Sequence, residues 1–168
     1  MDGKVTPDAL IDQWRRGLRI GQSAHYEAAK FYYRMHLRLS LPAVLISAAL
    51  STTVFASMQD SSVAWIKTAM AVLSVATVVL SSLQAALRLA ERSERHKTAA
   101  VQLGETRREL EQLLVFEHRD EATIEKLRKK WDAADRQAPT VPSRIYQNAM
   151  KQVQAAGDGG VAAKSNNG

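Results

Sequence analysis

The chain has 168 residues, no cysteine and a formal net charge of +6. The absence of cysteine excludes disulfides and thiolate chemistry. The length predicts a single domain over residues 1–156, and the glycine-, serine-, asparagine- and alanine-rich end, 157–168, is expected to be a disordered tail.

The N-terminal region predicts an amphipathic helix that starts at Thr6-Pro7, with Thr6 as cap and Pro7 in the first helical position. Its apolar and small residues recur at spacings of four and three, as in a heptad pattern, and form a seam along one face of the helix. The residues in the middle of this seam are glycine and alanine. Glycine costs a helix roughly 1 kcal/mol relative to alanine, so these positions predict a closely packed neighbouring helix; the alternative is a locally weak helix. The residues assigned to this helix-packing or oligomer seam are Trp14, Gly17, Gly21, Ala24 and Ala28, with Leu103 and Leu110 from a later helix.

Two uncharged stretches, Leu39–Gln59 and Thr68–Leu87, lie close together near the middle of the chain. As a helix, each is ~30 Å long, which is the thickness of the hydrocarbon core of a bilayer. The connection Asp60–Lys67 is short enough to make the two helices antiparallel neighbours. We therefore predict a transmembrane hairpin with the lipid bilayer as partner; the alternative is the buried core of a soluble helical protein.

The flanks of the two spans carry the signals of membrane topology. Tyr32 and Tyr33 precede the first span and Trp65 the second, and such rings suit the headgroup layer as interfacial anchors. Most lysine and arginine residues lie outside the hairpin, and Lys67 is the one basic residue of the connecting loop. The positive-inside rule then predicts a multi-pass protein with both termini in the cytoplasm. Anionic lipid and topology account for the basic charge, so no nucleic-acid partner is expected.

Beyond the hairpin the sequence predicts helices throughout. Pro42 indicates a break in the first long helix, because the residue before a proline is disfavoured in the α region. The second span has no stop signal after Leu87 and is expected to continue as one helix to about Leu114. A helix over Arg119–Gln137 and one from Pro142 to about Ala156 follow. The predicted fold is an all-α membrane protein: a two-transmembrane hairpin extended into the cytoplasm by long helices, plus two short C-terminal helices.

The two spans also carry polar side chains with helical spacing. Such groups in hydrocarbon turn away from lipid, toward a partner helix or a watery lumen, and both interpretations stay open. Two spans cannot enclose a water path, so a pore would require a homo-oligomer. The candidate pore-lining residues are Ser47, Ser51, Ser74, Thr77, Ser81 and Gln84.

The residues give little support for catalysis. The four histidines have no compact metal-ligand spacing, and His25 is expected to be packed or hydrogen-bonded. No phosphate-binding glycine loop, nucleophile elbow or pair of catalytic carboxylates occurs. We therefore expect no enzyme, no cofactor and no metal.

The layout as a whole resembles a known family. A helix bearing Trp14, His25, Ala28, Tyr32 and Arg34 precedes two spans with a tiny loop; the charged segment RLAERSERHKTAAVQLGETRRELEQLL and a proline-punctuated helical pair follow. Over roughly residues 8–155 this is similar to the SLATT family, two-transmembrane effector domains of bacterial conflict and antiphage systems. The resemblance implies an effector that oligomerises and forms pores or disrupts the inner membrane. It also implies a trigger from a separate sensor or nucleotide-signalling protein, or from a small ligand, because no sensor domain is attached.

Two functions are therefore carried forward. The first is a membrane effector of a bacterial defence system, which permeabilises the inner (cytoplasmic) membrane when a separate sensor activates it. The alternative is a non-conducting membrane anchor or scaffold that recruits a partner through its cytoplasmic helices.

Overall fold

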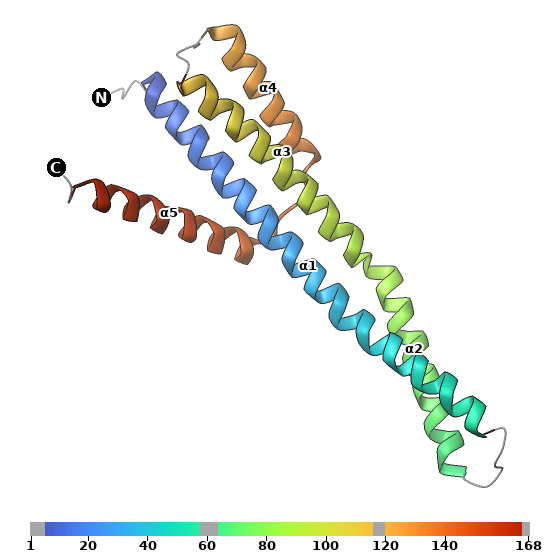
Figure 1. The fold of residues 1–168 in the computed structure, drawn as a ribbon. Coiled ribbons are helices and arrows are strands. Elements are labelled where there is room, and N and C mark those ends of the chain that lie inside the picture. The colour runs from blue at the N-terminus through green and yellow to red at the C-terminus, as the bar shows by residue number, and fades with distance from the viewer. Residues whose placement is uncertain (1–5, 58–63, 116–119, 166–168) are drawn as a thin grey trace. The chain divides into compact units, whose positions relative to one another are not determined.

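The computed structural model describes residues 6–57, 64–115 and 120–165, and these residues are almost entirely helical. Five helices follow one another: α1 (Pro7–Ser57), α2 (Ala64–Leu87), α3 (Leu89–Val115), α4 (Glu121–Gln137) and α5 (Ser143–Ser165) (Figure 1). The predicted all-helical fold is thus confirmed for the described parts of the chain. The chain divides into two compact units, a hairpin unit of residues 31–92 and a bundle unit of residues 1–30 and 93–168.

Helix α1 begins where the sequence predicts. The backbone N–H of Ala9 donates to Oγ1 of Thr6 at 3.3 Å, so Thr6 caps the helix ahead of Pro7. The helix then runs through Pro42 without interruption to Ser57, and the predicted break at Pro42 is wrong. A proline removes only one backbone donor from a helix, and a long helix can absorb that loss when neighbouring groups supply other hydrogen bonds.

The hairpin unit consists of the second half of α1 and the antiparallel α2 (Figure 1). Among the described residues, one helical stretch, Trp65–Val115, is long and apolar enough to cross a membrane; its most apolar window has a mean hydropathy of 1.9 and is 0% buried. The second predicted span lies in this stretch. The first predicted span is helical as far as Ser57, whereas Gln59 lies outside the described residues. A two-span hairpin therefore stays a prediction.

The predicted continuous helix from the second span onward is interrupted at Arg88. This residue has φ 47°, a left-handed conformation that costs a residue with a side chain roughly 1–2 kcal/mol. Its backbone still bonds on both sides, from its N–H to the Gln84 carbonyl at 3.1 Å and from the Arg92 N–H to its own carbonyl at 3.0 Å. Arg88 Nε also pairs with Glu91 Oε2 at 2.7 Å. Leu89, the next residue, is 3% exposed, and its burial helps to offset the strain.

The core of the bundle unit lies between α1, α3 and α4. The rings of Trp14 and Trp131 meet edge to face at a centroid distance of 6.0 Å and pack against this core. Lys130 of α4 also forms an ion pair with Glu109 of α3. The buried core residues are Ile11, Leu18, Leu103, Leu110, Leu127 and Ala134.

The last two helices follow the capping signals of the sequence. Helix α4 has Asp120 as its cap, which accepts a hydrogen bond from the Thr123 N–H at 3.2 Å. Helix α5 follows Pro142, whose carbonyl accepts from the Ile145 N–H at 2.9 Å. It runs to Ser165, beyond the predicted end near Ala156 and into the expected tail. Residues 166–168 lie outside the described residues.

Candidate functional site

The hairpin unit exposes a broad apolar surface. Leu45 of α1 is 68% exposed and Val78 of α2 is 65% exposed, and many large apolar neighbours are similarly uncovered. A soluble monomer rarely shows so large a contiguous apolar surface, whereas lipid tails match it. Within this chain, the second span is therefore not a buried core: the most apolar window of its helix is 0% buried. The other strongly exposed members are Leu41 and Val44 of α1 and Val72, Val75 and Val79 of α2.

The predicted interfacial anchors lie in the same unit. Trp65 is 70% exposed in the first turn of α2, and Tyr33 is more than half exposed on α1. Tyr32 is half-buried and meets the ring of Phe31 edge to face at 5.3 Å. Aromatic rings beside a span suit the headgroup layer, and this role stays a prediction for all three residues.

Four of the predicted pore-lining hydroxyls, those of Ser47, Ser51, Ser74 and Thr77, are hydrogen-bonded within their own helices. Each donates to the carbonyl four residues earlier, at 2.8 Å for Ser47 and Ser74 and at 2.9 Å for Ser51 and Thr77. Ser81 is exposed on α2. A hydroxyl satisfied in this way is tolerated against lipid or a helix and does not by itself require a water-filled lumen.

Gln84 differs from the other candidates, because its side chain reaches the neighbouring helix. Its Nε2 donates to the Leu39 carbonyl of α1 at 2.8 Å, three residues before Pro42. The carbonyl that loses its helical donor at Pro42 is that of Arg38, four residues earlier, so the bond to Leu39 lies next to this position and does not replace the lost one. Gln84 thus acts as a contact between α1 and α2, in agreement with the helix-packing interpretation.

The small-residue seam of α1 is covered inside the bundle unit. A Cβ on Gly21 would lie 3.1 Å from Cδ1 of Leu103, and one on Gly17 would lie 3.3 Å from the Trp131 ring. Ala24 and Ala28 are fully buried. The chain's own α3 and α4 therefore cover this seam, in agreement with its helix-packing interpretation. Leu103 and Leu110, from the later helix, are likewise buried.

A second close approach of α1 and α3 was not predicted from the sequence. A Cβ on Gly104 would lie 2.5 Å from Nε2 of Gln22, so the Gln22 amide occupies the space that glycine leaves open. Gly104 is the single glycine of α3, which is the one sequence signal that could have indicated this contact.

His25 and His96 form a buried pair between α1 and α3. Their Nδ1 atoms are 3.0 Å apart, and the two side chains are 6% and 2% exposed. In such a contact one Nδ1 donates its proton and the other accepts, so the accepting ring is neutral. Burial lowers the pKa of His25 against the opposing influence of Asp135; burial, helped by His25, lowers the pKa of His96 to about 4. The expectation that His25 is hydrogen-bonded is confirmed, whereas its partner was missed.

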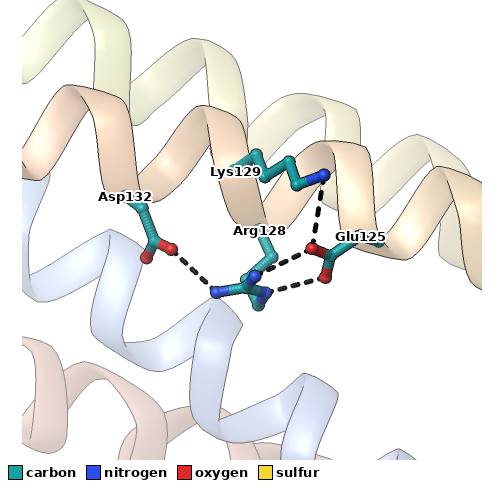
Figure 2. A network of polar contacts seen from close by, with 4 residues as sticks. All are labelled: Glu125, Arg128, Lys129 and Asp132. Carbon is teal, nitrogen blue, oxygen red and sulfur yellow. Dashed lines mark hydrogen bonds and ion pairs between the residues drawn. The ribbon is translucent and has the colours of Figure 1, made fainter.

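The outer surface of α4 carries a network of charged side chains (Figure 2). Arg128 donates through Nη2 and Nε to both carboxylate oxygens of Glu125 and through Nη1 to Asp132, each at 2.8 Å. Lys129 adds an ion pair with Glu125 at 3.6 Å. The Arg128 hydrogen bonds lower the pKa of Glu125 to about 2. All four residues lie on one solvated helix, so the network stabilises α4 locally.

The described residues contain no group of three or more histidine, aspartate or glutamate side chains that could hold a metal ion. Their architecture is that of an all-helical, membrane-associated protein with an exposed apolar hairpin and a packed helical bundle. Residues 18–159 match the model of the family described as SMODS and SLOG-associating 2TM effector domain, family 4. The chain belongs to this family, as the resemblance to SLATT proteins indicated, and the family implies a two-transmembrane effector domain of conflict and defence systems. Comparisons with curated proteins and with solved structures found no match.

Proposed function

We propose that the protein is a non-enzymatic effector of the bacterial inner membrane that permeabilises the membrane when a separate sensor protein activates it. Both spans would cross the bilayer, and both termini would lie in the cytoplasm. The observation that carries this proposal is the 0% burial of the most apolar window of the Trp65–Val115 stretch, whose exposed apolar surface lipid or other subunits would cover.

Permeabilisation requires an oligomer, because two helices cannot enclose a water path. The seam of α1 is already covered by α3 and α4, so the surfaces left for subunit contacts include the exposed faces of the hairpin unit. Polar groups on those faces, such as Ser74 and Ser81, would then turn from lipid toward neighbouring subunits.

Leakage of an encapsulated dye from liposomes that carry the purified full-length protein and its activator tests this proposal. We expect leakage from the wild type, and a rate about tenfold lower when Ser74, Thr77 and Ser81 are all replaced by leucine, since a hydrophobic constriction dewets. The matched control replaces the exposed Val75, Val78 and Val79 by leucine and should leak like the wild type. Leakage that the serine and threonine changes leave intact would contradict a lumen lined by these residues.

A second function, a non-conducting membrane anchor that recruits a partner, is favoured by the hydrogen bonds of the spans. The hydroxyls of Ser47, Ser51, Ser74 and Thr77 bond their own helices, and Gln84 bonds α1, so each of them is satisfied without a lumen. An anchor would resist extraction by carbonate and cause no leakage under any activating condition. Leakage from liposomes that contain only this protein and its activator would rule the anchor out.

A further inference from the structure

Four arginines lie at the open end of the hairpin unit, opposite the loop that connects its two helices. Arg34 and Arg38 belong to α1 and precede its exposed apolar residues, whereas Arg88 and Arg92 follow α2. All four side chains are exposed, and all four residues belong to the hairpin unit. These residues, called the arginine band below, are therefore a feature of one compact body.

The register of the two helices places the arginine band at one level. The bond from Gln84 Nε2 to the Leu39 carbonyl joins the helices just before the band. Because the helices are antiparallel, the band continues in one direction from this bond. At a rise of ~1.5 Å per residue, Arg38 lies ~2 Å beyond the bond and Arg92 ~12 Å beyond it. The band thus adjoins the apolar surface, where the headgroups add roughly 5–8 Å to each side of a bilayer.

The arginine band has little counter-charge. Glu91 is the single carboxylate among the described residues of the hairpin unit, and its Oε2 lies 2.7 Å from Nε of Arg88. Within the described chain no carboxylate pairs with Arg34, Arg38 or Arg92. Three exposed guanidinium groups therefore have their hydrogen-bonding capacity available to an anion from outside the chain.

The type of the basic residues points to phosphate. Lysine and arginine satisfy the positive-inside rule alike, so topology alone does not require four arginines. A guanidinium group differs from an ammonium group because its planar, paired N–H donors match two oxygens of one phosphate. The ring of Tyr33, which is 54% exposed beside Arg34, adds an aromatic side chain of the kind that lies among headgroups.

We propose that the arginine band binds an anionic phospholipid with two phosphate groups, of the cardiolipin type. Each helix offers one pair of arginines four residues apart, and each pair suits one phosphate. The axes of packed helices are about 8–10 Å apart, so long side chains from both pairs reach one headgroup. The acyl chains would pack on the apolar surface beyond the band, where Leu41 is 58% and Leu83 41% exposed. Basic sites between membrane helices suit such headgroups.

This inference rests on the part of the proposed function that sets both spans in the bilayer. A lipid held by both pairs joins α1 to the end of α2, at the point where Arg88 has φ 47°. The lipid thereby holds the open end of the hairpin together. Binding itself does not depend on whether the protein permeabilises membranes.

Native mass spectrometry of the purified full-length protein in detergent, which measures the fraction with bound lipid, tests the site. The probes are cardiolipin, phosphatidylglycerol, phosphatidylcholine and pyrophosphate. We expect cardiolipin to bind about tenfold more tightly than each of the other three. Equal binding of phosphatidylglycerol would show a surface for any anionic lipid and overturn the proposal. Equal binding of pyrophosphate would show a site for free phosphate compounds and overturn it as well.

Arg34→Gln and Arg92→Gln should each weaken cardiolipin binding about tenfold, because each removes charged donors from one pair. Lys67→Gln is the matched control: it removes one exposed positive charge from the other end of α2 and should change binding by less than about twofold. Equal losses in all three variants would reveal nonspecific charge attraction and overturn the site. Should either arginine variant unfold, as a thermal melt without lipid would show, Arg38→Gln takes its place.

A variant with both Arg34→Lys and Arg92→Lys keeps the charge and removes the paired donors. We expect it to bind cardiolipin at least about threefold more weakly than the wild type does. Binding as tight as that of the wild type would overturn recognition by guanidinium groups.

Liposome leakage in the presence of the activator separates this proposal from the proposed function. Selective cardiolipin binding by a protein that causes no leakage would overturn the effector and leave the lipid site intact. Leakage from a protein that binds cardiolipin no better than phosphatidylglycerol would overturn the lipid site and leave the effector intact.

Discussion

The Nδ1 atoms of His25 and His96 lie 3.0 Å apart inside the bundle unit and join α1 to α3 across 71 positions of sequence. Both side chains are buried and both have a lowered pKa, so the pair is neutral in the native protein. A buried contact that tolerates no added proton makes the stability of the bundle depend on pH.

We expect the thermal stability of the protein to be fully present above about pH 6.5 and to fall as the pH drops from 6.5 toward 4. The reason is that the unfolded chain takes up protons near the ordinary histidine pKa of 6.5, whereas native His96 resists them until about pH 4. Each histidine contributes a slope of at most ~1.4 kcal/mol per pH unit. Thermal melts of the detergent-solubilised protein at successive pH values measure this change of stability with pH.

Glu125 does not contribute to the expected loss of stability between pH 6.5 and 4.5. Its pKa is lowered from 4.5 to about 2, so the stability it contributes is present above pH 4.5 and is lost only as the pH falls below that value. A variant with His25→Gln and His96→Gln should show a much shallower fall between pH 6.5 and 4.5. An equally steep fall in that variant would show that other groups cause it.

Gly21→Leu should destabilise the bundle by about 2 kcal/mol or more, because a Cβ at this position already lies 3.1 Å from Cδ1 of the buried Leu103 and the added carbons have no space. Gly21→Ala should be nearly neutral, since a gain in helix propensity of about 1 kcal/mol offsets the small displacement of Leu103. Chemical unfolding of the detergent-solubilised protein measures both. Arg16→Leu, which places the same side chain on an exposed face of α1, is the control; a similar loss there would rule out the packing explanation.

Gln84→Leu should weaken the contact of α1 with α2 by about 0.6–2 kcal/mol, the range measured for hydrogen bonds between helices in membranes. The change removes the donor to the Leu39 carbonyl and keeps the volume of the side chain similar. Resistance to unfolding by denaturing detergent is a suitable readout. Ser82→Leu, on the exposed surface of the same helix, should leave it unchanged; if both variants behave alike, the hydrogen bond to Leu39 contributes little.

Val78→Lys should prevent stable membrane association. Val78 is 65% exposed near the middle of the second span, and a lysine at the centre of a span costs about 2.5–3.5 kcal/mol of insertion free energy. Carbonate extraction of membranes from cells that express the protein measures the effect, with Val78→Leu as the membrane-retained control. Full retention of the lysine variant would contradict the assignment of α2 to the bilayer.

Several features of the fold could be predicted because their signals are local. Thr6-Pro7 and Pro142 indicate where α1 and α5 begin, since a cap and a proline act on the backbone beside them. The uncharged run Thr68–Leu87 indicates a helix long and apolar enough to cross a membrane, because length and composition alone set that criterion.

Other features were decided only when distant segments met. The strained turn at Arg88 carries no glycine or proline signal, and it directly precedes the buried Leu89. Proline 42 was expected to end a helix, yet the helix continues, and an amide from Gln84 bonds its backbone nearby. In both places the backbone differs from what the local sequence signals indicate, and such signals are only weak priors for the folded state.

The sequence by itself determined that the chain is helical, that α2 suits a membrane and that α1 carries a small-residue face for close packing. Only the tertiary structure decided which partners fill that face, that His25 meets His96, and that Gln84 bonds the backbone of α1 at Leu39. The physical reason is range. Helix formation and lipid affinity depend on neighbours within a few turns, whereas a buried pair or a contact between helices depends on groups that the folding of the chain brings together.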